Sequence, residues 1–200
     1  MNNVTTNVAF FASGGGSTFE AFITEVEKGT LPLTPKLLVT NNSSCGAVEI
    51  AREHSVEVLH ISSKTHPNEK EFAKTLLETL LKHNVTLLLL VGYMKKLPIE
   101  VISQFEGSLY NTHPSLLPKY GGKGMFGIHV HSAIIENKES ETGVTIHLVS
   151  KEYDEGEIVA QKSLKVYPYD TPETLQEKVK AIERELYIHT IRSIVNSKSI

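Results

Sequence analysis

An asparagine and a histidine stand two residues apart at the end of an apolar run, as Asn111 and His113. The run 108–111 alternates like a strand, and a strand turns residues i and i+2 to the same side. The two side chains can therefore offer two hydrogen-bond donors to one small atom, the arrangement that stabilises a developing oxyanion. Pro114 and Pro118 fix the chain as it leaves the strand. The same pair also fits an ordinary polar strand exit, so spacing alone leaves both interpretations open.

An acidic segment, 151–157, supplies a carboxylate that would complete such a site. If the fold brings Asp154 beside His113, the carboxylate would orient the imidazole and favour its donor form. Acidic residues next to a glycine such as Gly156 are also typical of a solvated hairpin. Spacing along the chain cannot establish that Asp154 and His113 meet.

Three consecutive glycines, 14–16, join the first predicted strand to the first predicted helix. Backbone amides in such a turn can approach a ligand closely at a helix N-terminus, where partial positive charge favours anions. A dinucleotide fingerprint would require a small residue where Phe19 stands, and no Gly-Lys-Ser/Thr sequence follows. We predict a phosphate site here. The alternative is a tight turn capped by Ser17 or Thr18.

Other polar residues suggest alternatives that we weigh against this site. His129 and His131 follow a glycine-rich loop and could join His113 as metal ligands, but no carboxylate completes a familiar pattern, so no metal is expected. Ser115 lies near His113 without the Gly-x-Ser-x-Gly turn of a serine hydrolase, and we discount it as a nucleophile. His147, within a predicted strand, is interpreted as a hydrogen-bonded strand residue.

The composition limits the class of protein. The 200 residues are 40% hydrophobic and 22% charged with a formal net charge of −3, which favours a globular protein and argues against binding nucleic acid through a broad basic surface. The single cysteine, Cys45, permits no intrachain disulfide. No basic leader or bilayer-length apolar run is found. We therefore expect a cytoplasmic protein that binds neither membranes nor nucleic acid.

Short apolar runs alternate with amphipathic patterns through the first half of the chain. Strands are predicted at 8–12, 37–40, 58–61, 86–91 and 108–111, and helices at 17–28, 46–54, 68–83 and 98–105. This rhythm predicts right-handed crossovers and a doubly wound, mostly parallel sheet. After the loop 112–127, two β runs at 143–149 and 158–166 and a helix at 172–194 predict a mixed C-terminal part. The predicted fold class is a single α/β domain, Rossmann-like, without a separating linker.

Four segments together resemble phosphoribosylglycinamide formyltransferases, the folate-dependent enzymes of purine biosynthesis. They are the turn 13–18, Gly92-Tyr93-Met94, the run from Asn111 to Tyr120, and Tyr153-Asp154-Glu155-Gly156. The resemblance covers nearly the whole chain. It implies a formyltransferase domain over 1–200, with a phosphate-binding half at about 1–105 and a catalytic, folate-binding half at about 106–200.

The resemblance also implies roles for individual residues. The catalytic residues would be Asn111, His113 and Asp154. The ribonucleotide and its phosphate would be held by Gly15, Gly16, Ser17, Thr18 and Glu183. The folate would contact Met94, Lys95, Leu97, Asn111, Val144, Tyr153 and Asp154. Two residues depart from the family pattern: Thr18 stands where asparagine is usual, and Lys95 where arginine is common. The loop near 122–127 is also longer than in the family, and it can be interpreted either as a lid or as neutral surface.

The activity implied is transfer of a formyl group from 10-formyltetrahydrofolate, as co-substrate, to the amine of 5′-phosphoribosylglycinamide, without a metal. A monomer or homodimer is expected. The alternatives are a formyltransferase acting on another amine such as a sugar nucleotide, a formyl-folate hydrolase, and a non-catalytic folate- or nucleotide-binding module.

Overall fold

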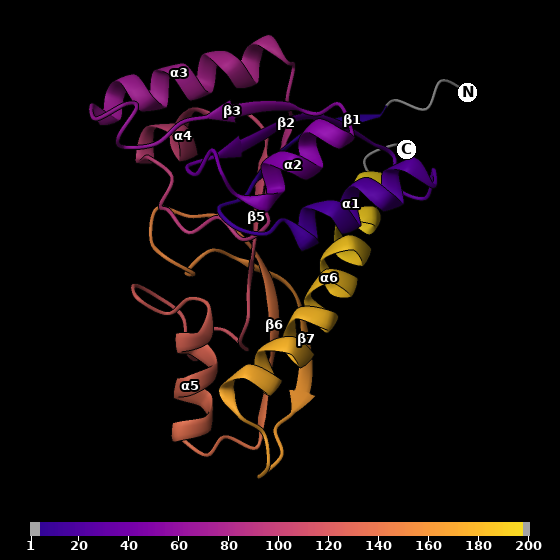
Figure 1. The fold of residues 1–200 in the computed structure, drawn as a ribbon, viewed down its shortest axis with the longest axis vertical. Coiled ribbons are helices and arrows are strands. Elements are labelled where there is room, and N and C mark those ends of the chain that lie inside the picture. The colour runs from indigo at the N-terminus through magenta and orange to yellow at the C-terminus, as the bar shows by residue number, and fades with distance from the viewer. Residues whose placement is uncertain (1–4, 198–200) are drawn as a thin grey trace. The chain divides into compact units, whose positions relative to one another are not determined.

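The computed structural model describes residues 5–197, and the chain divides into two compact units (Figure 1). Unit 1 runs to Leu109 and takes in the chain again from Ile194, and unit 2 is Tyr110–Ser193. The division falls a few residues after the boundary near 105 predicted between the two halves. That the halves act as one formyltransferase domain stays a prediction.

Unit 1 alternates strands and helices, as the hydrophobic periodicity predicts. Its elements are β1 (Thr6–Phe11), α1 (Ser17–Glu27), β2 (Leu33–Thr40), α2 (Gly46–Glu53), β3 (Glu57–His60), α3 (Glu69–Lys82), β4 (Leu87–Leu90) and α4 (Ile99–Gln104). The strands pair in parallel in the order β3-β2-β1-β4. All four residues of β4 are buried, as the uninterrupted leucine run predicts for a parallel strand.

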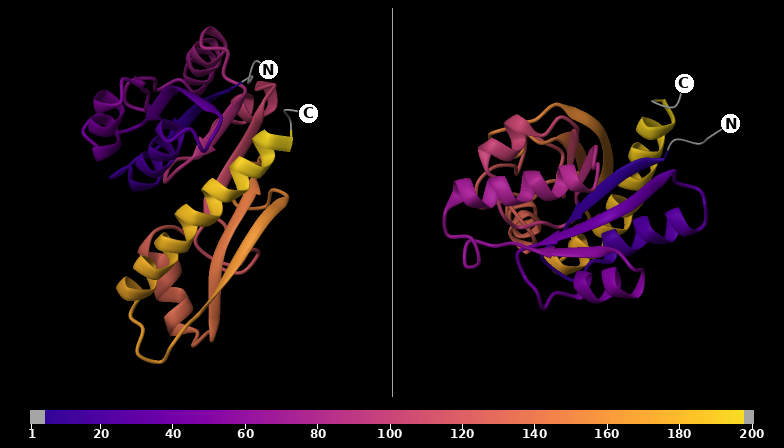
Figure 2. Two further views of the ribbon diagram at one scale, coloured as in Figure 1. Left: turned by 90° about the vertical axis from the view of Figure 1, so that its right-hand side faces the viewer. Right: turned by 90° about the horizontal axis from the view of Figure 1, so that it is seen from above.

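After β1, the chain adds β2 and then β3 along one edge of β1, and it later adds β4 along the opposite edge of β1. Right-handed crossovers in opposite directions place their helices on opposite faces of the sheet. Accordingly α1 contacts α2, and α3 contacts α4, with the strands between the two pairs (Figure 2, right). The predicted doubly wound parallel sheet is confirmed. Its switch point, where α/β sheets bind ligands, lies at the carboxyl ends of β1 and β4.

One boundary in unit 1 differs clearly from the prediction. β2 begins at Leu33, four residues before the predicted start, because β1 pairs with it from Thr6 onward. Pro35 interrupts the apolar pattern there, and the register of the two strands shifts between Val8 and Ala9. Pairing with a neighbouring strand therefore extends β2 through residues whose own sequence does not resemble a strand.

Unit 2 is built on an antiparallel sheet. It contains most of β5 (Ser108–His113), α5 (Ile128–Glu136), β6 (Glu141–Leu148), β7 (Ile158–Lys165) and most of α6 (Pro172–Ser197). β6 pairs with β5 and with β7, both antiparallel, so the predicted mixed C-terminal part is confirmed.

The long helix α6 runs along this sheet (Figure 2, left). The hydroxyl of Tyr187 donates to the carbonyl of Tyr110 at 2.9 Å, and the Lys162 ammonium lies 2.8 Å from a Glu185 oxygen. Within residues 5–197, no helix has both the length and the apolar character needed to cross a membrane.

Candidate functional site

Strand β5 carries both Asn111 and His113. It continues to His113, two residues beyond the predicted end, because β6 pairs with it there. Asn111 lies opposite His147 and His113 lies opposite Thr145. Residues paired across antiparallel strands share a face. Four polar side chains therefore gather on one face of the unit 2 sheet.

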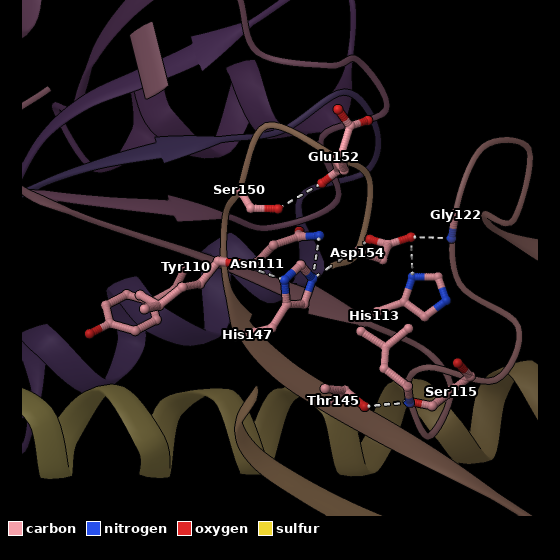
Figure 3. A network of polar contacts seen from close by, with 12 residues as sticks. Tyr110, Asn111, His113, Ser115, Gly122, Thr145, His147, Ser150, Glu152 and Asp154 are labelled. Atoms are coloured by element: carbon pink, nitrogen blue, oxygen red, sulfur yellow. Dashed lines mark hydrogen bonds and ion pairs between the residues drawn. The ribbon is translucent and has the colours of Figure 1, made fainter. Parts of the chain in front are cut away.

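The imidazole of His113 is buried, and both of its nitrogens have polar partners, of which Figure 3 shows Asp154. Its Nε2 lies 2.7 Å from the Tyr120 carbonyl oxygen, and its Nδ1 lies 3.4 Å from Asp154 Oδ2. A carbonyl only accepts, so Nε2 carries a hydrogen and donates it to Tyr120. Nδ1 is therefore the ring nitrogen that faces the Asp154 carboxylate.

Asp154 is placed by an unusual turn between β6 and β7. It adopts a left-handed backbone conformation, with φ of 58°, which is uncommon outside glycine and which Asp tolerates better than most residues. Two residues later, a Cβ on Gly156 would stand 1.7 Å from the Leu148 carbonyl oxygen, so no side chain fits. The backbone amide of Gly122 donates to Asp154 Oδ2 at 2.9 Å. The proximity of Asp154 and His113 that sequence spacing left open is therefore present.

Asn111 is held by a residue that the sequence analysis did not assign to the site. Its Nδ2 lies 3.2 Å from His147 Nε2, and His147 Nδ1 lies 2.8 Å from the Leu148 carbonyl oxygen. Asp154 Oδ1 is 3.6 Å from the same Nε2. Burial lowers the pKa of His147, so the ring is neutral near pH 7. The prediction of a hydrogen-bonded strand residue is confirmed, but the contact with Asn111 was missed.

One signal in the sequence points toward His147. Thr145 and His147 stand two apart in an otherwise apolar strand, repeating the spacing of Asn111 and His113. Two polar residues on one face of a buried strand require partners. The partner itself depends on the register of β5 against β6, which local sequence does not specify.

The segment after β5 is fixed to the sheet by Thr145. Its hydroxyl donates to the Ser115 carbonyl at 2.7 Å and accepts from the Leu117 amide at 3.0 Å. The buried Ser115 hydroxyl donates to the Lys119 carbonyl at 2.6 Å. Ser115 thus supports the loop, which agrees with discounting it as a nucleophile.

In unit 1, the glycine turn and the loop after β4 meet at the switch point. The Ser13 amide donates to the Gly92 carbonyl at 3.0 Å, and its hydroxyl donates to Asn41 Oδ1 at 2.5 Å. The same hydroxyl accepts from the Met94 amide at 2.9 Å. A predicted phosphate loop and a predicted folate contact therefore share one edge of this unit.

The three glycines of the turn are not equivalent. Gly16 has φ of 83°, and a Cβ there would stand 2.7 Å from the Cα of Ala47, so this glycine is required by the chain's own packing. A Cβ on Gly14 or Gly15 would meet no heavy atom within 4 Å. Gly16 is itself the N-cap of α1, without a side-chain cap, so neither Ser17 nor Thr18 caps the helix as the alternative required.

The other predicted folate contacts differ in exposure. Met94 and Lys95 are exposed in unit 1, and Leu97 is buried. In unit 2, Tyr153 is exposed beside Asp154, whereas Val144 is fully buried. Since Thr145 faces the same side as His113, Val144 faces the other side of β6. The structure does not bring the Val144 side chain to Asn111, His113 and Asp154, the three residues predicted to be catalytic and hereafter called the catalytic trio.

Glu183, predicted to contact the ribonucleotide, lies half-buried on α6. Burial raises the pKa of its carboxyl to about 7, although Arg184 and Lys180 nearby act in the opposite direction. Among the residues that the structure describes, no hydrogen bond or ion pair joins Glu183 to the catalytic trio.

The histidines considered as metal ligands separate in the structure. His131 is buried on α5, and burial, with lesser contributions from Lys180 and His113, lowers its pKa to about 4. His129 is exposed with its ring edge-on to Phe126. Between residues 5 and 197, no group of three or more His, Cys, Asp or Glu side chains could hold a metal ion.

Known proteins share this sequence and fold. The formyl transferase family matches residues 6–191. A chloroplastic phosphoribosylglycinamide formyltransferase of Arabidopsis thaliana is 38% identical over 96% of this chain, which spans 66% of that protein's length. The Bacillus subtilis phosphoribosylglycinamide formyltransferase is 29% identical, covering 94% of this chain and 93% of its own.

A crystal structure of phosphoribosylglycinamide formyltransferase from Bacillus halodurans superposes with a TM-score of 0.88 at 33% identity, covering 95% of each chain. Agreement in sequence over nearly the whole chain and in fold leads to one conclusion. The chain belongs to the formyl transferase family.

Proposed function

We propose that this chain transfers the formyl group of 10-formyltetrahydrofolate to the amine of 5′-phosphoribosylglycinamide, a step of purine (IMP) biosynthesis. The observation that carries the proposal is that Asn111 and His113 share one face of β5 and that the Asp154 carboxylate lies 3.4 Å from His113 Nδ1. The names of relatives similar over nearly the whole chain support the choice of acceptor.

The first step is attack of the neutral amine on the formyl carbon, which forms a C–N bond and leaves negative charge on the formyl oxygen. Asn111, through Nδ2–H, and the protonated ring of His113, through Nδ1–H, would donate to that oxygen. The His113 ring is held in place because its Nε2–H is donated to Tyr120. Removing one oxyanion donor typically lowers turnover by about 10²–10³-fold.

The second step breaks the bond between the formyl carbon and N10 of the folate. The proton lost by the attacking amine must reach N10, and Asp154, 3.4 Å from His113 Nδ1, is the base placed to receive and return it, directly or through water. The products are the formylated ribonucleotide and tetrahydrofolate. No covalent enzyme intermediate is required, because binding aligns the two reactants.

The ribonucleotide phosphate would bind the turn formed by Gly15, Gly16, Ser17 and Thr18, where open backbone precedes the N-terminus of α1. Glu183 would contact the ribonucleotide.

The folate would lie against Met94, Lys95, Leu97 and Tyr153, with Asn111 and Asp154 at its reactive end. Val144 stays a prediction whose side-chain position offers no support. The cytoplasmic location and a monomeric or homodimeric state also stay predictions.

The test is an assay of the purified chain with glycinamide ribonucleotide and a formyl-folate analogue, following deformylation of the folate. We expect turnover that requires both substrates and is lost in His113→Ala. Deformylation without any amine would identify a hydrolase, and turnover only with a sugar-nucleotide amine would identify another acceptor. Folate binding without transfer would identify a non-catalytic module. Each of these three results would overturn the proposal.

A further inference from the structure

We propose that His147 is a positioning residue that sets the orientation of the Asn111 amide, so that an N–H rather than the carbonyl oxygen faces the reacting formyl group. This inference rests on the proposed function, since it concerns how the oxyanion donor is prepared. It assigns a role to a residue on β6 that is not in the catalytic trio.

The tautomer of His147 follows from its surroundings. The Leu148 carbonyl, 2.8 Å from Nδ1, can only accept, so Nδ1 carries the hydrogen. Burial lowers the pKa of the ring and keeps it neutral, which leaves a lone pair on Nε2. Nε2 is therefore an acceptor, and the group 3.2 Å away must donate to it.

That donor is the Asn111 amide, and its orientation is fixed as a result. With Nδ2 toward His147, one amide hydrogen is donated to Nε2 and the second stays available for a ligand. A flipped amide would set Oδ1 against the Nε2 lone pair, two acceptors in contact, with no hydrogen bond between them. The neutral ring of His147 thus selects one of the two amide orientations.

The selected orientation directs the amide nitrogen toward the rest of the trio. Asp154 Oδ1 lies 3.6 Å from His147 Nε2, and Asp154 Oδ2 lies 3.4 Å from His113 Nδ1. The nitrogen ends of Asn111 and His113 therefore border the same carboxylate (Figure 3). A flipped Asn111 would present an oxygen there and repel the charge that the site must stabilise.

The strand holds His147 firmly enough for this task. Its side chain is 2% exposed, and it lies directly opposite Asn111 in the register of β5 and β6. The amide of the next residue, Leu148, donates to the Glu157 carbonyl at 2.9 Å. This hydrogen bond fixes Leu148, whose own carbonyl accepts from His147 Nδ1. His147 therefore has little freedom to follow a rotating Asn111 amide.

Two substitutions separate the two hydrogen bonds of His147. In His147→Gln, the side-chain oxygen can take the place of Nε2 and accept from Asn111, while the bond to Leu148 is lost. In His147→Asn, the shorter amide can take the place of Nδ1 and donate to Leu148, while Asn111 loses its acceptor. We expect His147→Gln to keep kcat within about threefold and His147→Asn to lower it about tenfold or more, below the full loss of an oxyanion donor. The KM for the ribonucleotide should stay unchanged in both.

A double-mutant cycle with Asn111→Ala tests whether His147 acts through Asn111. Asn111→Ala should lower kcat about 10²–10³-fold. If His147 acts only by orienting that amide, His147→Asn should lower kcat no further in the Asn111→Ala background. Thermal unfolding of each variant, and the intact KM, verify that the site is folded.

The outcomes separate this inference from the proposed function. Multiplicative losses in the double variant, or a larger loss in His147→Gln than in His147→Asn, would overturn the positioning role. Full activity in His147→Asn would overturn it as well. Near-normal turnover in Asn111→Ala would instead remove the oxyanion role of Asn111 and with it the proposed mechanism.

Discussion

Tyr120 serves the catalytic trio through its backbone rather than its side chain. Its carbonyl oxygen accepts the Nε2 hydrogen of His113, and two residues on, the Gly122 amide donates to Asp154. The Asp154 oxygen that accepts from Gly122 is Oδ2, the same atom that lies 3.4 Å from His113 Nδ1. At the scale of single residues, the site is therefore an imidazole and a carboxylate aligned by main-chain groups.

This alignment predicts separate effects on turnover and binding. His113→Ala removes an oxyanion donor and Asp154→Asn removes the proton acceptor, so each should lower kcat by at least about 100-fold. The affinity for the ribonucleotide, measured by titration calorimetry, should change little because neither side chain is assigned to the phosphate. Near-normal kcat in either variant would contradict the catalytic assignment.

The predicted phosphate site can be tested with a matched pair of glycine substitutions. Gly15→Ala adds a methyl group where no protein atom lies within 4 Å, so the melting temperature should hold while the KM for the ribonucleotide rises. Gly16→Ala forces a side chain into a left-handed conformation, at about 1–2 kcal/mol, and against Ala47, so it should lower the melting temperature. An unchanged KM in Gly15→Ala would remove the phosphate-site assignment.

At the scale of elements, the loop after β5 is held from its far side by Glu139. The Tyr120 hydroxyl donates to Glu139 Oε1 at 3.0 Å, and the Lys119 ammonium lies 3.0 Å from the same oxygen. These hydrogen bonds, that of Lys119 first, hold the pKa of the Glu139 carboxyl below its usual value. Glu139 therefore anchors the segment whose carbonyl orients His113.

We expect Glu139→Gln to lower kcat several-fold by loosening this anchor, with the KM for the ribonucleotide unchanged. Glu136→Gln, an exposed residue at the end of α5, removes the same charge without a contact to Tyr120 and should leave kcat unchanged. Steady-state kinetics of the two variants side by side makes the comparison. Equal values for both would show that the anchor has no catalytic consequence.

Helices and strands with strong local patterns could be predicted from the sequence. Contacts that depend on how one strand pairs with another could not. The leucine pattern of α3 and its Asn68 cap, which accepts from the amides of Lys70 and Glu71, specify that helix locally. The shared face of Asn111 and His113 could be predicted because the two residues stand two apart in one strand, whereas the proximity of Asp154 to His113 depends on the turn between β6 and β7. The contact of His147 with Asn111 depends on the register of β5 and β6, which local sequence does not specify. The contact of Tyr120 with His113 uses a main-chain oxygen, and every residue type has one, so the sequence cannot indicate it.

At the scale of the whole molecule, the half-buried Glu183 and the buried His131 give the free energy of unfolding opposite dependences on pH. The carboxyl of Glu183 has its pKa raised to about 7, so its contribution is present below about 4.5 and is lost as pH rises toward 7. His131 has its pKa lowered to about 4, so its contribution is present above about 6.5 and is lost as pH falls toward 4. Each slope is at most about 1.4 kcal/mol per pH unit, and the two oppose one another.

We expect Glu183→Gln to remove one of these two opposing slopes. The free energy of unfolding of the variant, measured with urea between pH 4.5 and 6.5, should then rise more steeply with pH than that of the parent chain. The matched variant His131→Gln should show the reverse, a free energy that falls as pH rises. Parallel pH curves for all three proteins would contradict burial as the cause of these shifts.

The hydroxyl of Ser13 would couple the binding of the two proposed substrates, the ribonucleotide and the folate. It donates to Asn41 and accepts from Met94, so the loops after β1, β2 and β4 share one atom. Ordering any one of these loops restricts the motion of the other two. A second ligand would then bind loops that have already lost conformational entropy, so its own binding would cost less entropy. If the turn after β1 binds the phosphate and the loop after β4 contacts the folate, as predicted, we expect binding of one ligand to favour binding of the other without any displacement of the strands of unit 1.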